Sequence, residues 1–250
     1  MEFFEVLLST DMYIDALRSK GEYPCKEKLP QTVIFLPQKM ISQYLLSEYV
    51  HHYGKGFLSK VAFLDHSSVA LCSGYGFGAA ALAIKLEELI AWGVKRFIMV
   101  GVGCVLTSEL PIHSCILVHK ALGVDGVSAF YQQKKEPVEL GKQLKNFLDL
   151  YSLKEGIIPR AASCISSDLF FLPSEQKMKM DPMPPADILD FETAALYAIT
   201  QKRGVEALSL LITSDILPAP EWIPGYDSEA TIEELKRIAD FAVRFCKQGF

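Results

Sequence analysis

The chain has 250 residues, half of them hydrophobic, which is enough for one α/β domain with a large core. Its formal net charge of −5 argues against binding to nucleic acid polymers or to anionic membrane surfaces. The N-terminal segment lacks the basic start of a signal peptide, and no apolar run is long enough to span a bilayer. We therefore expect a cytoplasmic protein that acts on a small molecule.

The six cysteines and five histidines indicate neither a metal site nor a disulfide framework. The chain contains no C-x-x-C pair and no H-E-x-x-H pattern, and most of the cysteines lie in apolar runs. We expect reduced core thiols and no metal. No internal repeat or Pro/Gly/Ser-rich linker divides the chain, so residues 1–250 are expected to form a single domain.

Segments of strand and helix character alternate along the chain, which is the pattern of an α/β layered fold. In the first half they are a strand at 32–36, a helix at 40–53, a strand at 68–72, a helix at 79–92, and strands at 96–100 and 115–119. In the second half they are a helix at 138–151, strand-like residues up to 164, a proline-rich loop at 180–185, a helix at 192–202, a strand at 207–213 and a helix at 231–245. Thr231 and Glu234 fit a capping box at the start of the last helix.

Ligands in open α/β sheets bind outside the carboxyl ends of strands, so the residues that follow the expected strands are candidates. The first candidate is the cluster of Gly74, Gly76 and Gly78. Its third glycine comes one place too early for a dinucleotide fingerprint, and position 79 is alanine. The cluster therefore favours a turn through which the backbone approaches a ligand, rather than an NAD site.

Two acidic residues flank an aromatic residue where a helix is expected to begin: Asp190, Phe191 and Glu192. Capping of the helix explains Asp190, because acids favour the positive end of the helix dipole. It explains Glu192 less well, because Glu192 precedes a nearly all-apolar helix that must be buried. A buried carboxylate needs hydrogen-bond partners, and two sugar hydroxyls are suitable ones.

Two further strand ends carry polar residues. Asp215, after Thr213 and Ser214, is either a turn residue or a general acid, and its position leaves both interpretations open. The aromatic pair in the segment 166–171 belongs either to the core or to a surface that stacks on a heterocycle.

Together, residues 74–106, 166–171 and 189–215 resemble the nucleoside phosphorylase superfamily, which includes purine nucleoside and uridine phosphorylases. LEELIAWGVKRFIMVG is similar to the family's helix and strand before its phosphate loop, ISSDLFF to a segment of bacterial purine nucleoside phosphorylases, DFETAALYAI to the ribose motif and ITSD to the purine-recognition segment. The resemblance implies a three-layer α/β/α fold with a central mixed β-sheet. It also implies a homo-oligomer built from dimers that cleaves the N-glycosidic bond of a purine nucleoside with phosphate, giving the base and ribose 1-phosphate.

The resemblance also implies roles for individual residues. Glu192 would bind the ribose hydroxyls, and Asp215 would bind the base and protonate it as the bond breaks, which fits a reaction that moves electrons from sugar to base. Further substrate-binding candidates are Phe191, Asp190, Phe170, Ser167, Gly76 and Ser214.

The phosphate site departs from the family pattern. The family's arginine before the glycine loop falls on Met99, its loop serine falls on Val102, and the early Gly-Asp-Pro segment becomes Gln38-Lys39-Met40. Methionine and valine cannot hold phosphate as an arginine fork does. The remaining phosphate candidates are Gly101, Val102, Gly103, Lys39 and Lys55.

Three functions therefore stay open. The first is a nucleoside phosphorylase with phosphate as a possible co-substrate, and no other cofactor is expected. The second is a nucleosidase that uses water, and the third is a nucleoside- or nucleobase-binding homologue without turnover.

Overall fold

The computed structural model describes residues 9–21, 29–54, 58, 60–132, 136–169, 185–217 and 222–248. The elements in chain order are α1 (Thr10–Ser19), β1 (Thr32–Leu36), α2 (Lys39–Glu48), β2 (His51–Tyr53), β3 (Lys60–Leu64), β4 (Val69–Ser73), α3 (Ala79–Ala91), β5 (Arg96–Val105), β6 (Cys115–Val124), α4 (Gly126–Gln132), β7 (Val138–Glu139), α5 (Lys142–Glu155), β8 (Arg160–Ser167), β9 (Ile188–Asp190), α7 (Thr193–Arg203), β10 (Glu206–Ile216) and α8 (Glu229–Lys247). The alternation of strands and helices confirms the expected α/β class.

The strands form one mixed sheet in the order β10-β6-β8-β9-β5-β1-β4-β3-β2, with β7 paired to β6. Because β10 also pairs with β5, the strands β5, β10, β6, β8 and β9 form a closed ring of pairings. The strands β4, β1, β5 and β10 run parallel to their neighbours in this series, so their carboxyl ends lie at one edge of the sheet. That edge is where the candidate residues were expected.

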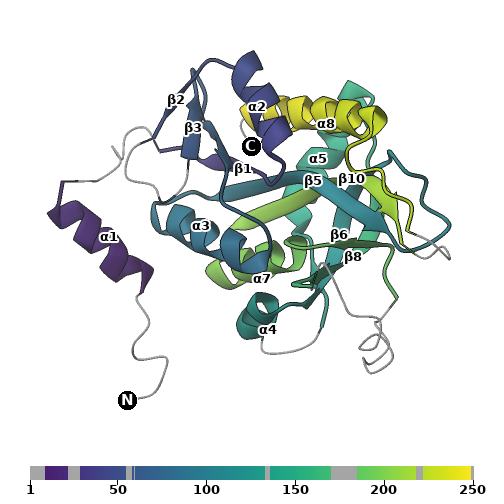
Figure 1. The fold of residues 1–250 in the computed structure, drawn as a ribbon. Helices are drawn as coiled ribbons and strands as arrows, with labels where there is room; N and C mark the ends of the chain where they lie inside the picture. The colour runs from purple at the N-terminus through teal and green to yellow at the C-terminus, as the bar shows by residue number, and fades with distance from the viewer. Residues whose placement is uncertain are drawn as a thin grey trace.

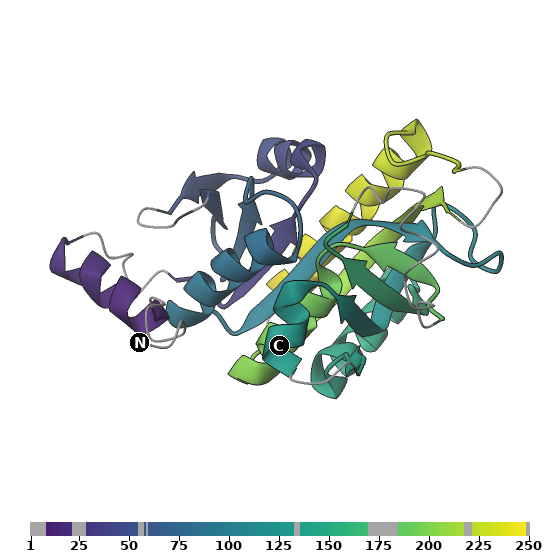
Figure 2. The ribbon, with the colours of Figure 1, turned by 60° about the horizontal axis from the view of Figure 1, so that its bottom comes forward.

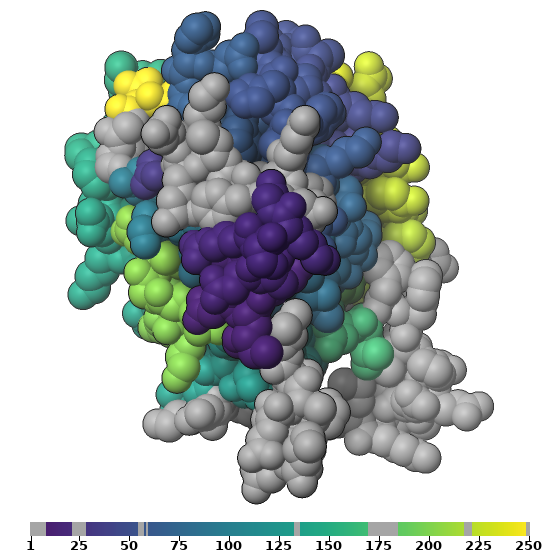
Figure 3. Space-filling view, turned by 90° about the vertical axis from the view of Figure 1, so that its left-hand side faces the viewer, coloured from purple at the N-terminus to yellow at the C-terminus, as the bar shows by residue number. Residues whose placement is uncertain are grey.

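The helices cover the sheet on two sides (Figure 1). The helices α2, α5 and α8 pack on one side, and α3, α4 and α7 pack together on the other, which comes forward in Figure 2. Helix α1 lies at the periphery, on the surface facing the viewer in Figure 3, and contacts α3. This arrangement confirms the three-layer α/β/α architecture. None of the described helices is long and apolar enough to cross a membrane.

Helix α7 is the most deeply buried of the three helices α3, α4 and α7, because its first eight residues, 193–200, are all buried. Tyr197 on this helix donates its hydroxyl to the carbonyl of Val118 at 2.7 Å and accepts the backbone N–H of Ser209 at 3.0 Å. One phenol thus links α7 to both β6 and β10. This contact fixes the helix whose first turn carries the acidic motif.

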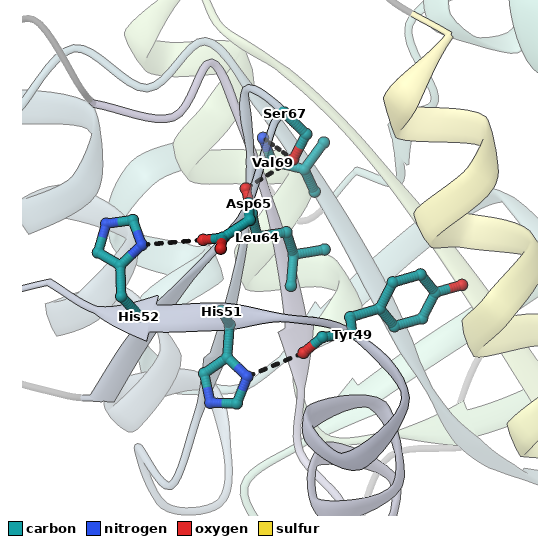
Figure 4. A network of polar contacts seen from close by, with 7 residues as sticks. All are labelled: Tyr49, His51, His52, Leu64, Asp65, Ser67 and Val69. Carbon is teal, nitrogen blue, oxygen red and sulfur yellow. Dashed lines mark hydrogen bonds and ion pairs between the residues drawn. The ribbon is translucent and has the colours of Figure 1, made fainter.

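The helix expected at 40–53 is shorter in the structure. Helix α2 ends at Glu48, and His51–Tyr53 forms the edge strand β2, which pairs with β3. Nδ1 of His51 lies 2.9 Å from the carbonyl oxygen of Tyr49, and Nδ1 of His52 lies 3.2 Å from Oδ1 of Asp65. Figure 4 shows both contacts. The strand depends on backbone hydrogen bonds to β3, and a helical spacing of apolar residues does not reveal such a partner.

The capping box predicted for the last helix is wrong. Helix α8 begins at Glu229, and the hydroxyl of Ser228 caps it by accepting the N–H of Thr231 at 3.3 Å. The hydroxyl of Thr231 instead donates to the carbonyl of Gly225 at 2.7 Å. The start of α8 therefore anchors the segment that leads into it.

Two glycines flank α5 and allow a matched test of backbone conformation. A Cβ would meet open space at both positions, but Gly156 has a φ of +69° whereas Gly141 has an extended backbone with a φ of −61°. We expect Gly156→Ser to lower the free energy of unfolding by about 1 kcal/mol, because a left-handed residue with a Cβ is strained.

Gly141→Ser is the control, because it supplies a capping hydroxyl and is expected to raise the free energy of unfolding by a few tenths of a kcal/mol. Urea unfolding measures both variants. Equal losses in the two would contradict the assigned conformations.

Candidate active site

Glu192 is the N-cap residue of α7, and its side chain is buried, with 4% exposed. Its Oε1 accepts the backbone N–H of Gly78 at 2.8 Å. Gly78 follows β4 and has a φ of +87°, a backbone conformation that residues other than glycine rarely adopt. The glycine loop therefore brings a backbone donor to a buried carboxylate.

Burial, followed by the charge of nearby Asp190, raises the pKa of Glu192 from 4.5 to about 7. The backbone hydrogen bonds from Gly78 and Phe191 act in the opposite direction. The charge of Glu192 consequently changes near neutral pH. Additional hydrogen-bond donors, such as hydroxyl groups, stabilise its ionised form more than its protonated form.

Asp190 holds the first turn of α7 in place. One of its oxygens accepts the hydroxyl of Ser166 and the thiol of Cys164, and the other accepts the N–H and the hydroxyl of Thr193. These four donors match the number of acceptor positions on a carboxylate. Asp190 is also only 2% exposed. The protein therefore already supplies its donors, Asp190 caps the first turn of α7, and its contact with substrate stays a prediction.

Ser166 makes contacts at the site that the sequence interpretation, which named Ser167, did not predict. Its hydroxyl donates to Asp190 and accepts the N–H of Ala194 at 2.9 Å, so it joins the end of β8 to the start of α7. The neighbouring hydroxyl of Ser167 accepts the N–H of Leu169 at 3.0 Å instead. The contact of Ser167 with substrate stays a prediction. In a strand adjacent residues point to opposite faces, and this alternation is the signal that separates the two serines.

Asp215 lies near the carboxyl end of β10 and is 5% exposed. Its Oδ1 accepts the N–H of Gly225 at 2.8 Å, and its Oδ2 accepts the hydroxyl of Ser214 at 2.8 Å. A Cβ on Gly225 would lie 2.2 Å from the carbonyl oxygen of Ser214, so only glycine fits there. The predicted residue Ser214 thus orients the carboxylate of Asp215.

Cys104 on β5 joins the two acidic segments. It lies opposite Leu189 on β9 and opposite Asp215 on β10, and its thiol donates to Oδ2 of Asp215 at 3.6 Å. Burial and the adjacent Asp215 raise the pKa of this thiol to about 12, so it stays protonated and can donate. The sheet therefore brings both acidic segments to the same end of β5.

Two aromatic rings stand beside Glu192. Phe191 is partly buried and meets Phe77 edge-on, with ring centroids 6.1 Å apart. Phe77 is 66% exposed and belongs to the glycine loop, in which Gly76 has a φ of +102°. Sequence reasoning missed Phe77, although an aromatic between two glycines is a usable signal. Phe170 lies outside the described residues.

The proposed anion loop is a strand. Residues 101–103 continue β5 and pair with residues 211–213 of β10, where the sequence predicted that their backbone would hold phosphate. Successive N–H groups of a strand point in opposite directions and do not converge on one anion as in a nest. Lys39 is exposed at the first residue of α2, and Lys55 lies outside the described residues.

Five of the six arginines form ion pairs with residues outside this site. All six lie in the described ranges, and five of them form ion pairs: Arg18 with Asp15, Arg96 with Glu206, Arg203 with Glu87, Arg237 with Glu234, and Arg244 with Glu155. The sixth, Arg160, is exposed at the first residue of β8. Met99, at the family's arginine position, is buried. The described residues also contain no cluster of three or more His, Cys, Asp or Glu side chains that fits a metal ion.

Comparison with known proteins gives these features a family context. Residues 38–248 match the model of the phosphorylase superfamily. A purine nucleoside phosphorylase from Caldanaerobacter subterraneus subsp. tengcongensis is 26% identical over 169 residues, which cover 66% of this chain and 72% of that protein.

Two solved structures have the same fold. The purine nucleoside phosphorylase of Toxoplasma gondii in complex with immucillin-H has a TM-score of 0.73 and 17% identity, covering 89% of this chain and 92% of the other. The 5′-methylthioadenosine/S-adenosyl homocysteine nucleosidase of Campylobacter jejuni has a TM-score of 0.71 and 18% identity, covering 88% of this chain and 99% of the other. The chain belongs to the phosphorylase superfamily of nucleoside phosphorylases and nucleosidases.

Proposed function

We propose that this protein cleaves the N-glycosidic bond of a purine nucleoside. The observation that carries the proposal is the pair of buried carboxylates, Glu192 and Asp215, each held by the backbone N–H of a glycine at the same end of β5. Relatives named as phosphorylases and as a nucleosidase support the class of reaction. Breaking this bond puts positive charge on the sugar and negative charge on the leaving base, and two separate acids suit those two needs.

Glu192 faces the sugar in this proposal. Its carboxylate accepts hydrogen bonds from the 2′- and 3′-hydroxyls of ribose. These hydroxyls replace the water molecules that a buried carboxylate cannot reach. A negative charge beside the ring also favours the oxocarbenium-like transition state. Phe191 and Phe77 form an apolar edge next to this position, against which the sugar or the base packs.

Asp215 faces the base. Within the described residues, Oδ1 accepts one hydrogen bond, from the N–H of Gly225, so it has room for a proton or for a hydrogen bond to the purine. Ser214 and Cys104 orient the other oxygen. As the bond breaks, Asp215 gives its proton to N7, which neutralises the charge that develops on the base.

Three features inferred from the resemblance remain predictions. They are the stacking of Phe170 on the purine, the homo-oligomer built from dimers and the cytoplasmic location. Whether phosphate or water attacks the sugar, giving ribose 1-phosphate or ribose, also lies beyond the bond cleavage proposed here. A nucleoside-binding homologue without turnover is the competing function.

Replacing Asp215 with asparagine tests its role as acid. Asparagine keeps an oxygen for Gly225 but has no proton to give, so we expect Asp215→Asn to lower kcat by about 10²–10⁴-fold with an unchanged fold. Release of free base from purine nucleosides measures kcat, and thermal unfolding monitors the fold. Asp149→Asn, at an exposed position of α5, is the matched control and is expected to have no effect on kcat. An unchanged rate in Asp215→Asn would remove the residue from catalysis.

The pKa of Glu192 predicts how nucleoside affinity depends on pH. Because ribose hydroxyls need the ionised carboxylate, we expect affinity to fall by up to about tenfold per pH unit as pH decreases below about 7. Calorimetry with a nucleoside measures this slope, and the free base is the control because it lacks the sugar. Glu192→Gln is expected to remove the slope for the nucleoside. A slope that survives in Glu192→Gln would contradict the assignment.

The same pKa predicts an opposite trend in stability without ligand. The pKa is raised from 4.5 to about 7 on folding, so the folded chain binds more protons in that interval and loses stability as pH rises through it. We expect Glu192→Gln to lack this loss, which urea unfolding at several pH values would measure. A steeper loss in the variant would contradict the raised pKa.

A further inference from the structure

A one-residue shift in the pairing of β10 with β5 determines which side chain lies beside Asp215. The two strands are neighbours in the sheet (Figure 1), and Thr213 lies opposite Gly103. One step along β5, Cys104 lies opposite Asp215 and not opposite Ser214. Because the side chains of a strand alternate between the two faces of a sheet, one extra residue turns those after it to the other face. The shift therefore brings Asp215 to the face that Cys104 occupies.

This face of β5 is the less covered one at the carboxyl end of the strand. Val102 and Cys104 are partly exposed, whereas the alternate residues Gly101, Gly103 and Val105 are buried. Cys104 therefore combines contact with a buried acid and partial exposure at the strand end where the site lies.

The two oxygens of Asp215 differ in the number of hydrogen bonds that they accept. Within the described residues, Oδ2 accepts the hydroxyl of Ser214 at 2.8 Å and the thiol of Cys104 at 3.6 Å. Oδ1 accepts one hydrogen bond there, from the N–H of Gly225 at 2.8 Å. Each oxygen of a carboxylate has two acceptor positions. Both positions of Oδ2 are therefore filled, and one position of Oδ1 is open.

The thiol of Cys104 serves as a hydrogen-bond donor and not as a nucleophile. Burial, followed by the charge of Asp215 and the hydrogen bond to it, raises the pKa of the thiol to about 12. The thiol therefore keeps its proton at neutral pH, whereas nucleophilic attack requires the thiolate. A protonated thiol is a weak donor, so its effect on Asp215 is that of one weak hydrogen bond.

We propose that Cys104 is a positioning residue that keeps the acidic proton of Asp215 on Oδ1. The inference rests on the proposed bond cleavage. With two donors on Oδ2, the proton of the neutral carboxyl group occupies the open position of Oδ1, facing N7 of the base. As the nucleophile, phosphate or water, bonds to C1′, the C1′–N9 bond breaks with its electron pair on the base. Oδ1 gives its proton to N7, and the carboxylate left behind keeps its three donors and regains a proton from solvent.

Variants without a donor test this role in the full chain, with a panel of purine ribonucleosides as substrates. Cys104→Ala and Cys104→Val remove the thiol, so the proton of Asp215 can occupy either oxygen. We expect both variants to lower kcat by about fivefold, the size of one weak hydrogen bond, with KM unchanged. Cys104→Ser keeps a donor and is expected to hold kcat within about twofold of the parent chain.

Cys115→Ala is the matched control. Cys115 is a partly exposed thiol at the first residue of β6, and burial likewise raises its pKa to about 12. The charges that act on it are those of Arg237 and Glu234 on α8, not those of the site. We expect Cys115→Ala to leave kcat and KM unchanged.

A double-mutant cycle with Asp215→Asn separates positioning from a structural role. Asparagine has no acidic proton to position, so we expect Cys104→Ala to lower kcat no further in the Asp215→Asn chain. An equal loss in both backgrounds would show that Cys104 supports the fold, and it would overturn the inference. A raised KM with an unchanged kcat, or a Cys104→Ser variant as slow as Cys104→Ala, would also overturn it.

The parent chain separates failure of this inference from failure of the proposed function. Release of base at an unchanged rate by Cys104→Ala and Cys104→Val overturns the role of Cys104 and leaves the bond cleavage standing. No release of base by the parent chain from any purine ribonucleoside, with or without inorganic phosphate, overturns both.

Discussion

The site depends on hydrogen bonds from backbone amides to two buried carboxylates. A carboxylate withdrawn from water is stable only when donors replace its hydration, and the backbone N–H groups of Gly78 and Gly225 are such donors to Glu192 and Asp215. Gly78 has a positive φ, and Gly225 lies where a side chain would collide with the backbone. These donors leave acceptor capacity free, whereas the four donors to Asp190 do not. This difference separates the two acids that we propose to contact substrate from Asp190.

Much of this arrangement could be predicted from sequence because local chemistry determines it. Strand β1 matches the expected range, and the helix expected at 79–92 ends one residue earlier. The acids could be located because Glu192 precedes a helix too apolar to be exposed, and Asp215 lies near the carboxyl end of an apolar strand. Several motifs in one order then indicated the family, which the superfamily match over residues 38–248 confirms.

The remainder depends on partners distant in sequence. The edge strand β2 exists because β3 pairs with it, and β5 extends through residues 101–103 because β10 continues beside it. Neither pairing can be recognised from the residues of the segment itself. A helix was therefore expected through residues 51–53, and an anion-binding loop at residues 101–103. Ser166 and Phe77 were missed for a related reason: their roles arise from contacts with Asp190 and Phe191, on other segments. The methionine at position 99, where the family has an arginine, was visible in the sequence, but the hydrogen bonds to Asp190 and Asp215 required coordinates.

In the proposed complex, one nucleoside contacts both acids, with its sugar at Glu192 and its base at Asp215. A crystal structure of the protein with a bound purine nucleoside would test this arrangement. We predict hydrogen bonds between the 2′- and 3′-hydroxyls and Glu192, and between N7 of the same molecule and Asp215. A nucleoside bound with either carboxylate out of contact would contradict it.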